Sequence, residues 1–206
     1  MKRARSSSKS STSKYKKTKS SDSLTMYKQP KNPVRFVKRH ADYFTVIVNG
    51  TTGVLGAYNF TLSSVPGYTE FTNLYDQYKI NAISVCFYPK QNSVTSLVTL
   101  DNIKANARFL SAIDYNDDTP PANFDAIREY ESCHVTACTE KHEVYIKEPL
   151  FLNNSGQNVN GWVSTANPTT RYYGLKYGCE PTLSSGVPTQ TFQVECVFYL
   201  SFKNVK

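Results

Sequence analysis

Apolar and polar residues alternate along the C-terminal part of the chain. In the segment TFQVECVFYLSF every second position is apolar: Phe192, Val194, Cys196, Phe198, Leu200 and Phe202. A period of two places these side chains on one face of a β-strand, whereas a helix would scatter them around its axis. A slip of one residue would exchange the two faces, so the pattern predicts a strand with a fixed register.

The same period recurs through the rest of the chain beyond residue 40. It predicts strands over residues 43–48, 54–62, 78–88, 96–100, 108–115 and 171–177. In the strand over residues 108–115, Phe109, Ile113 and Tyr115 are expected on one face. Two further strands, 133–139 and 142–147, flank Glu140-Lys141, and we interpret them as a hairpin.

Helical patterns are scarce. Residues 122–130 follow Thr119-Pro120-Pro121 and could form two helical turns, with Phe124 and Ile127 on one side. A helical turn is also expected over residues 69–75. Residues 151–170 and 180–190 are rich in Asn, Ser, Gly and Pro and indicate loops. About eight strands joined by such loops predict an all-β sandwich or barrel of Greek-key type.

Charge divides the chain into two parts. The 206 residues carry a net charge of +8, but residues 1–40 alone hold a net +12 and residues 41–206 a net −4. The sequence therefore predicts a basic N-terminal arm, residues 1–40, and a mildly acidic β-domain, residues 41–206. The first 25 residues are almost entirely Ser, Thr, Lys and Arg, so we expect them to be disordered until an anionic partner binds.

Nucleic acid is the expected partner of this arm. Lys and Arg side chains that contact phosphates release condensed counterions, which gives an affinity independent of sequence. The candidate nucleic-acid-binding residues are Lys2, Arg3, Arg5, Lys9, Lys14, Lys16, Lys17, Lys19, Lys28, Lys31, Arg35, Lys38 and Arg39. Tyr15, Tyr27 and Phe36 lie among them and could stack on unpaired bases. The clusters within residues 2–19 also match a nuclear-localisation signal, which predicts host nuclear import machinery as a partner.

Several protein classes are disfavoured. No apolar run approaches the length needed to span a bilayer, and the arm lacks an apolar face that could insert into one. Walker A, dinucleotide-binding, nucleophile-elbow and H-E-x-x-H motifs are absent from the sequence. We therefore expect a protein that is not an enzyme and that has no cofactor.

Two clusters could hold metal ions, although neither has the spacing of a dedicated site. The segment from Cys133-His134 through Cys138 to His142 carries zinc-type ligands, but in a hairpin Cys133 would point away from His134 and Cys138. Residues 114–118 (DYNDD) could bind calcium, yet they lack the Gly of a calcium loop. Ordinary packing and an Asp/Asn-rich turn are the favoured interpretations, and an ion between subunits stays open.

Trp162, the single tryptophan, lies in a polar segment. It could anchor an interface or pack in the interior.

The order of these features resembles the capsid proteins of circovirus-like viruses, which have circular, Rep-encoding single-stranded DNA genomes. The resemblance rests on FTNLYDQYKI followed by ISVCFYP (residues 71–89), on FLSAIDYNDD followed by Pro120-Pro121 and a short helix (residues 109–130), and on the alternating C-terminal strand. It covers most of the chain through short motifs. The arm departs from the Arg-dominated arms of vertebrate circoviruses, since it is mostly Lys and Ser.

This resemblance implies a single jelly roll of two antiparallel four-stranded sheets. It also implies self-assembly into a small icosahedral shell, with T=1 symmetry and the arms inside around single-stranded DNA. The protein would then occur in the virion, and in the host nucleus during assembly, and would meet a host receptor that the sequence does not identify. A capsid protein of a small RNA virus and a cellular nucleic-acid-binding β-barrel remain alternatives. The net −4 of the domain argues against the barrel.

Overall fold

The computed structural model describes residues 34–48, 52–90, 107–153, 155–181 and 190–206. Ten of the thirteen candidate nucleic-acid-binding residues, together with the predicted strand over residues 96–100 and most of the predicted loop over residues 180–190, lie outside the described residues. The described chain contains no helix long and apolar enough to cross a membrane.

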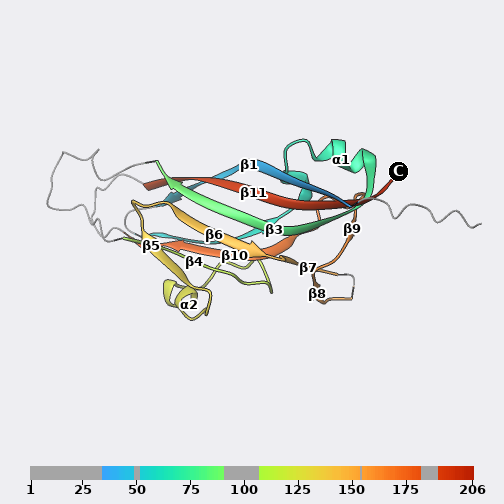
Figure 1. Ribbon diagram of the computed structural model, residues 1–206. Coiled ribbons are helices and arrows are strands. Elements are labelled where there is room, and N and C mark those ends of the chain that lie inside the picture. Colours follow the sequence, from blue (N-terminus) through green and yellow to red (C-terminus); the bar gives the residue numbers. More distant parts are fainter. Residues whose placement is uncertain (1–33, 49–51, 91–106, 154, 182–189) are drawn as a thin grey trace, which may run out of the picture. The chain divides into compact units, whose positions relative to one another are not determined.

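Two antiparallel sheets make up the described part of the chain (Figure 1). The first sheet has the order β1-β11-β3-β6, and short β9 also pairs with β3. The bounds of its strands are β1 Arg35–Val48, β3 Tyr75–Pro89, β6 His142–Lys147, β9 Val163–Ser164 and β11 Gln190–Val205. Its two longest pairings join distant parts of the sequence, since β11 lies between β1 and β3.

The second sheet has β10 at its centre. Strand β10 pairs with β4, β2 and β7, while β5 pairs with β4, and β8 with β7. The strands are β2 Val54–Phe60, β4 Arg108–Ala112, β5 His134–Ala137, β7 Leu150–Leu152, β8 Asn158–Val159 and β10 Tyr172–Cys179. Four long strands in one sheet, and β5-β4-β10-β2 in the other, give the two four-stranded layers that a jelly roll requires, with β7, β8 and β9 added.

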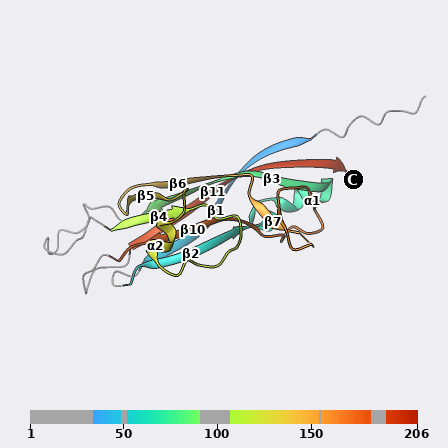
Figure 2. The same cartoon turned by 90° about the horizontal axis from the view of Figure 1, so that it is seen from below.

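The helices are short, as the sequence predicts. Helix α1 (Tyr68–Leu74) follows the 3₁₀ turn η1 (Leu62–Ser64) and leads directly into β3. Helix α2 (Phe124–Arg128) begins at the N-cap Asn123, whose side-chain oxygen accepts a hydrogen bond from the Ala126 amide at 2.8 Å. Figure 2 shows α2 beside β4 and β10, and α1 near the start of β3.

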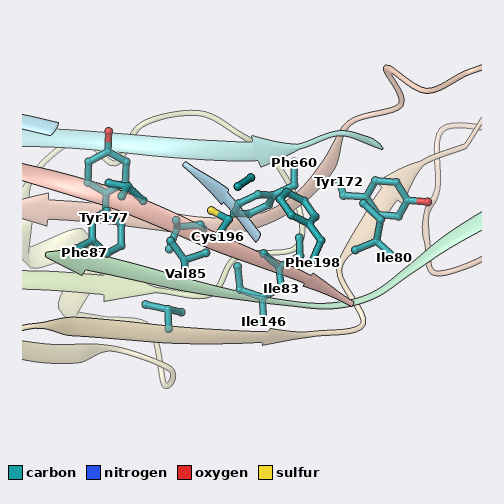
Figure 3. Packing of buried hydrophobic residues seen from close by; sticks show 14 of the residues in the cluster. Phe60, Ile80, Ile83, Val85, Phe87, Ile146, Tyr172, Tyr177, Cys196 and Phe198 are labelled. Carbon is teal, nitrogen blue, oxygen red and sulfur yellow. The ribbon is translucent and has the colours of Figure 1, made fainter. Parts of the chain in front are cut away.

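The alternation predicted for the C-terminal strand is confirmed. All six apolar residues from Phe192 to Phe202 at even positions are buried, at 0–1% exposure. They face aromatic side chains of the opposite sheet, so that Phe60 of β2 packs edge-on against Phe198 with ring centroids 6.1 Å apart. Figure 3 shows this core between the sheets. The hydrophobic effect of these buried faces holds the two layers together.

One predicted pairing is wrong. Strands β5 and β6 do not form a hairpin, because β5 pairs with β4 in the second sheet and β6 pairs with β3 in the first. The intervening turn, closed by the Glu140 amide on the Ala137 carbonyl, carries the chain from one layer to the other. The same residues can form a hairpin turn or a turn that joins strands of different sheets. The sequence pattern alone therefore did not distinguish these two connections.

Strand boundaries also differ from the predicted ones. Strand β4 ends at Ala112, three residues before the predicted end at residue 115. The chain turns there, and the Asp114 carboxylate accepts a hydrogen bond from the Asn116 amide. Strand β1 begins at Arg35 and not at residue 43, since its whole length pairs with β11. Residues 35–40, counted with the arm by their charge, thus lie within the strand.

Candidate functional site

The described part of the predicted nucleic-acid-binding set consists of Arg35, Lys38 and Arg39, all in β1. Strand alternation sends Lys38 and Arg39 to opposite faces. Lys38 is exposed, and its Nζ lies 5.6 Å from the ring centroid of Tyr199. The guanidinium carbon of Arg39 lies instead 5.0 Å from the centroid of Phe71 in α1, and its Nε is buried without a hydrogen-bond partner. The strand therefore separates side chains that the sequence had grouped together.

The histidines and cysteines of residues 133–142 are occupied by packing contacts. The buried His142 ring has Nδ1 2.8 Å from the Thr136 hydroxyl and Nε2 2.7 Å from the Ser111 hydroxyl. His134 stacks on it at 4.6 Å between ring centroids. Burial, and then the charge of His134, lowers the pKa of His142 to about 4, so this imidazole is neutral at pH 7.

The remaining thiols of this segment point elsewhere. Cys133 packs against the small apolar cluster beneath α2, whereas the Cys138 sulfur lies 2.8 Å from the buried Cys179 sulfur. The hydrogen bond to Cys138 and burial both raise the pKa of Cys179, which keeps the thiol protonated. Within the described residues, no group of three or more His, Cys, Asp or Glu side chains is arranged to hold a metal ion.

The acidic run after β4 surrounds a lysine. The Nζ of Lys176, in β10, lies 2.8 Å from an Asp114 carboxylate oxygen and 3.1 Å from one of Asp117. The Tyr130 hydroxyl donates a hydrogen bond to the same Asp114 oxygen at 2.8 Å. Burial alone would raise the pKa of Asp114, but the hydrogen bonds from Lys176, Asn116 and Tyr130 hold it below its usual value. The ammonium group of Lys176 therefore contacts two of the carboxylates that the sequence suggested as calcium ligands.

Lys176 is a residue that the sequence analysis missed. It lies in the segment RYYGLKYGC. All the other residues of β10 are apolar, aromatic or glycine, and Arg171 immediately precedes the strand. A lone lysine in such a strand requires a buried partner, and the acidic run at residues 114–118 was the available one.

Trp162 is half-buried, and the Nζ of Lys203 lies 4.3 Å from its ring centroid.

The sequence and the fold were compared with known proteins. The family model described as "Circovirus capsid protein" matches residues 3–206, nearly the whole chain. The chain belongs to the circovirus capsid protein family. The resemblance found from the sequence motifs is thereby confirmed, and the protein is a viral capsid protein whose place is the virion.

Solved structures agree on the fold. The 60-mer of the BFDV capsid protein superposes with a TM-score of 0.57 at 13% identity, covering 85% of this chain and 96% of that chain. The decameric BFDV capsid protein gives 0.54 at 13% identity, with 84% and 100% covered. Tobacco necrosis virus gives 0.55 at 7% identity, with 84% and 97% covered. At such identities the likeness shows the viral jelly roll itself, which this family shares with RNA-virus capsids. A search of curated protein sequences gives no match.

Proposed function

We propose that this capsid protein assembles into a small icosahedral shell and packages a single-stranded DNA genome through its basic arm. The observation that carries the packaging role is the concentration of thirteen basic residues and one acid in residues 1–40. Circovirus-like genomes are single-stranded DNA, and a cationic segment neutralises such a polyanion without reading its sequence. A cellular β-barrel does not fit the family match.

The assembly role is supported by the BFDV capsid protein, which forms a 60-mer and a decamer on the same fold. A shell of 60 subunits has T=1 symmetry. About 60 arms of net +12 carry on the order of 700 positive charges, which would offset most of a genome of about one kilobase. Weak contacts between subunits suffice in such a shell, because many of them act together. The role is structural and requires no catalytic group.

Neutralising the arm tests the packaging role. The ten basic residues from Lys2 to Lys31 are replaced by Gln in the full chain, so that β1 stays intact. A deletion of residues 1–40 is avoided because it would remove the first six residues of β1. We expect the variant to fold and to lose most of its salt-sensitive retention of nucleic acid. The control replaces four exposed lysines and arginines of the β-domain, Lys90, Arg108, Lys141 and Arg171, by Gln. Unchanged retention by the arm variant would refute packaging through the arm.

The nature of the packaged nucleic acid is tested on opened particles. We expect the contents to be degraded by a deoxyribonuclease and to resist a ribonuclease. The opposite result would identify an RNA-packaging capsid protein, which the shared jelly roll allows.

Assembly in the host nucleus is the remaining part of the proposal. The clusters Lys2-Arg3-Arg5 and Lys14-Lys16-Lys17-Lys19 have the composition of import signals. Residues 1–20 fused to a fluorescent reporter should concentrate it in nuclei, and the same fusion with these seven residues changed to Gln should not. A diffuse signal from the unchanged fusion would remove this part of the proposal.

A further inference from the structure

The four lysines that the strands of the first sheet place on its outer face, Lys38, Lys79, Lys147 and Lys203, lie at one end. Residues directly opposite each other on neighbouring strands share a face, and one such row runs Lys38, Tyr199, Ala82, Lys147 across β1, β11, β3 and β6. Lys79 lies in the next row, opposite Ser201, and Lys203 lies in the row beyond it, opposite Gln77. We call the residues Lys38, Lys79, Tyr145, Lys147, Tyr199 and Lys203 the basic end of the sheet.

The other end of the same face is acidic. Glu195 and Glu143 lie in one row, on either side of Cys86. Lys141, at this end, forms an ion pair with Glu143 at 2.8 Å. Among the described side chains, no carboxylate belongs to the rows of the basic end, but Glu143 of the adjacent row accepts a hydrogen bond at 3.2 Å from Ser84, the cross-strand partner of Tyr145. The net −4 of residues 41–206, which include Lys79, Lys147 and Lys203 of the basic end, therefore conceals a local separation of charge along the sheet.

Aromatic rings stand among these lysines. Tyr145 is 55% exposed, and its ring meets that of Tyr199 at 6.2 Å and 70°. Their partners across the strands are Ser84 and Ala82, whose small side chains leave the rings standing above the sheet. Lys38 and Lys203 lie over the rings of Tyr199 and Trp162 respectively. Ring faces that attract a cation also stack with bases.

The direction of the chain connects this face to the arm. Arg35, the first residue of β1, pairs with Phe202 near the end of β11, so β1 starts at the basic end. Residues 1–33 are therefore joined to the sheet at this end. Phe36, 75% exposed, extends the same face in the row of Ser201 and Lys79.

We propose that the basic end binds the single-stranded genome directly, with its lysines on the phosphates and Tyr145 and Tyr199 stacked on unpaired bases. The inference rests on the proposed function and extends the contact from the arm to the β-domain. Exposed rings favour a single strand, whose bases are free to stack, over a duplex. A second protein subunit fits less well, because protein interfaces are depleted of lysine at their centres.

The test compares two pairs of charge-removing variants in the full chain. Lys38→Gln with Lys147→Gln alters the basic end, whereas Lys90→Gln with Lys141→Gln removes the same charge from exposed positions elsewhere. Binding of labelled oligothymidylate is measured over a series of salt concentrations, with light scattering to follow assembly. Each phosphate contact in a single strand contributes about 0.7 to the slope of log K against log salt. We expect the first pair to lower that slope by about 1.4, and the second pair to match the unchanged chain.

A readout of stacking complements the salt series. Tyr145→Ala should weaken binding by roughly 5- to 150-fold without changing the slope. Oligonucleotides carrying bromodeoxyuridine should cross-link, under ultraviolet light, to the peptides that contain Tyr145 and Tyr199.

Three results would overturn the proposal. Equal slopes for both pairs, with cross-links confined to residues 1–33, would restrict binding to the arm. Failure of the first pair to assemble, with an unchanged slope, would identify the face as a contact between subunits. Absence of any oligothymidylate binding by the unchanged chain would remove the proposed function as well, which separates the two failures.

Discussion

The ammonium of Lys176 lies 2.8 Å from the carboxylate of Asp114, and both side chains are buried, with exposures of 8% and 5%. Lys176 belongs to β10 of the second sheet, whereas Asp114 lies two residues beyond the end of β4. The pair thus fixes the segment that follows β4 against the outer face of the sheet. Tyr130, just after α2, completes the arrangement through its hydrogen bond to Asp114.

Removing one member of this pair should destabilise the β-domain strongly. Lys176→Met leaves a buried carboxylate without its cation, for which we expect a loss of about 3–5 kcal/mol in the free energy of unfolding. Arg171→Met, which removes an exposed ion pair to Asp118 at 3.5 Å, should cost about 1 kcal/mol or less. Denaturant unfolding measures both, and equal effects would contradict the role assigned to Lys176.

The sequence contained both halves of this pair but not their proximity. The acidic run and the strand with its lone lysine are more than fifty positions apart, and their contact depends on β4 pairing with β10. Strand positions followed from the period of two, because that pattern is local. Sheet membership did not, and for that reason the connection from β5 to β6 was taken for a hairpin.

The basic end shows the same limit. Each of Lys38, Tyr199 and Lys147 is visible in the sequence as a polar position of an alternating strand. Only the register of four strands puts them in one row. Net charge, a sum over the domain, could not reveal a separation of charge along one face. The arm, by contrast, was evident from composition alone, because its charges are contiguous.

Acid should destabilise the domain through His142. Its pKa is lowered to about 4 in the folded chain, against about 6.5 unfolded, because the ring is buried and faces His134. Stability is therefore complete above about pH 6.5 and is lost as the pH falls towards 4, by up to about 3 kcal/mol. The measurement is the free energy of unfolding as a function of pH.

His142→Gln removes this titration and should flatten that pH dependence. The same acid sensitivity in His142→Gln would show that other groups, such as the carboxylates paired with Lys176, account for it.

Neighbouring residues of β11 should differ sharply in their contributions to stability. Phe198 is fully buried against Phe60, whereas Val197 lies on the outer face. Phe198→Ala should therefore cost about 3–5 kcal/mol, and Val197→Ala about 1 kcal/mol or less. Thermal or denaturant unfolding of the two variants measures the difference, and comparable losses would contradict the assigned faces of the strand.

Electron microscopy of the purified full chain tests the central claim most directly. We expect uniform, closed, spherical particles whose nucleic acid resists nuclease until the shell is opened and is then degraded by a deoxyribonuclease. A chain that remains monomeric at every salt concentration and pH would contradict assembly into a shell.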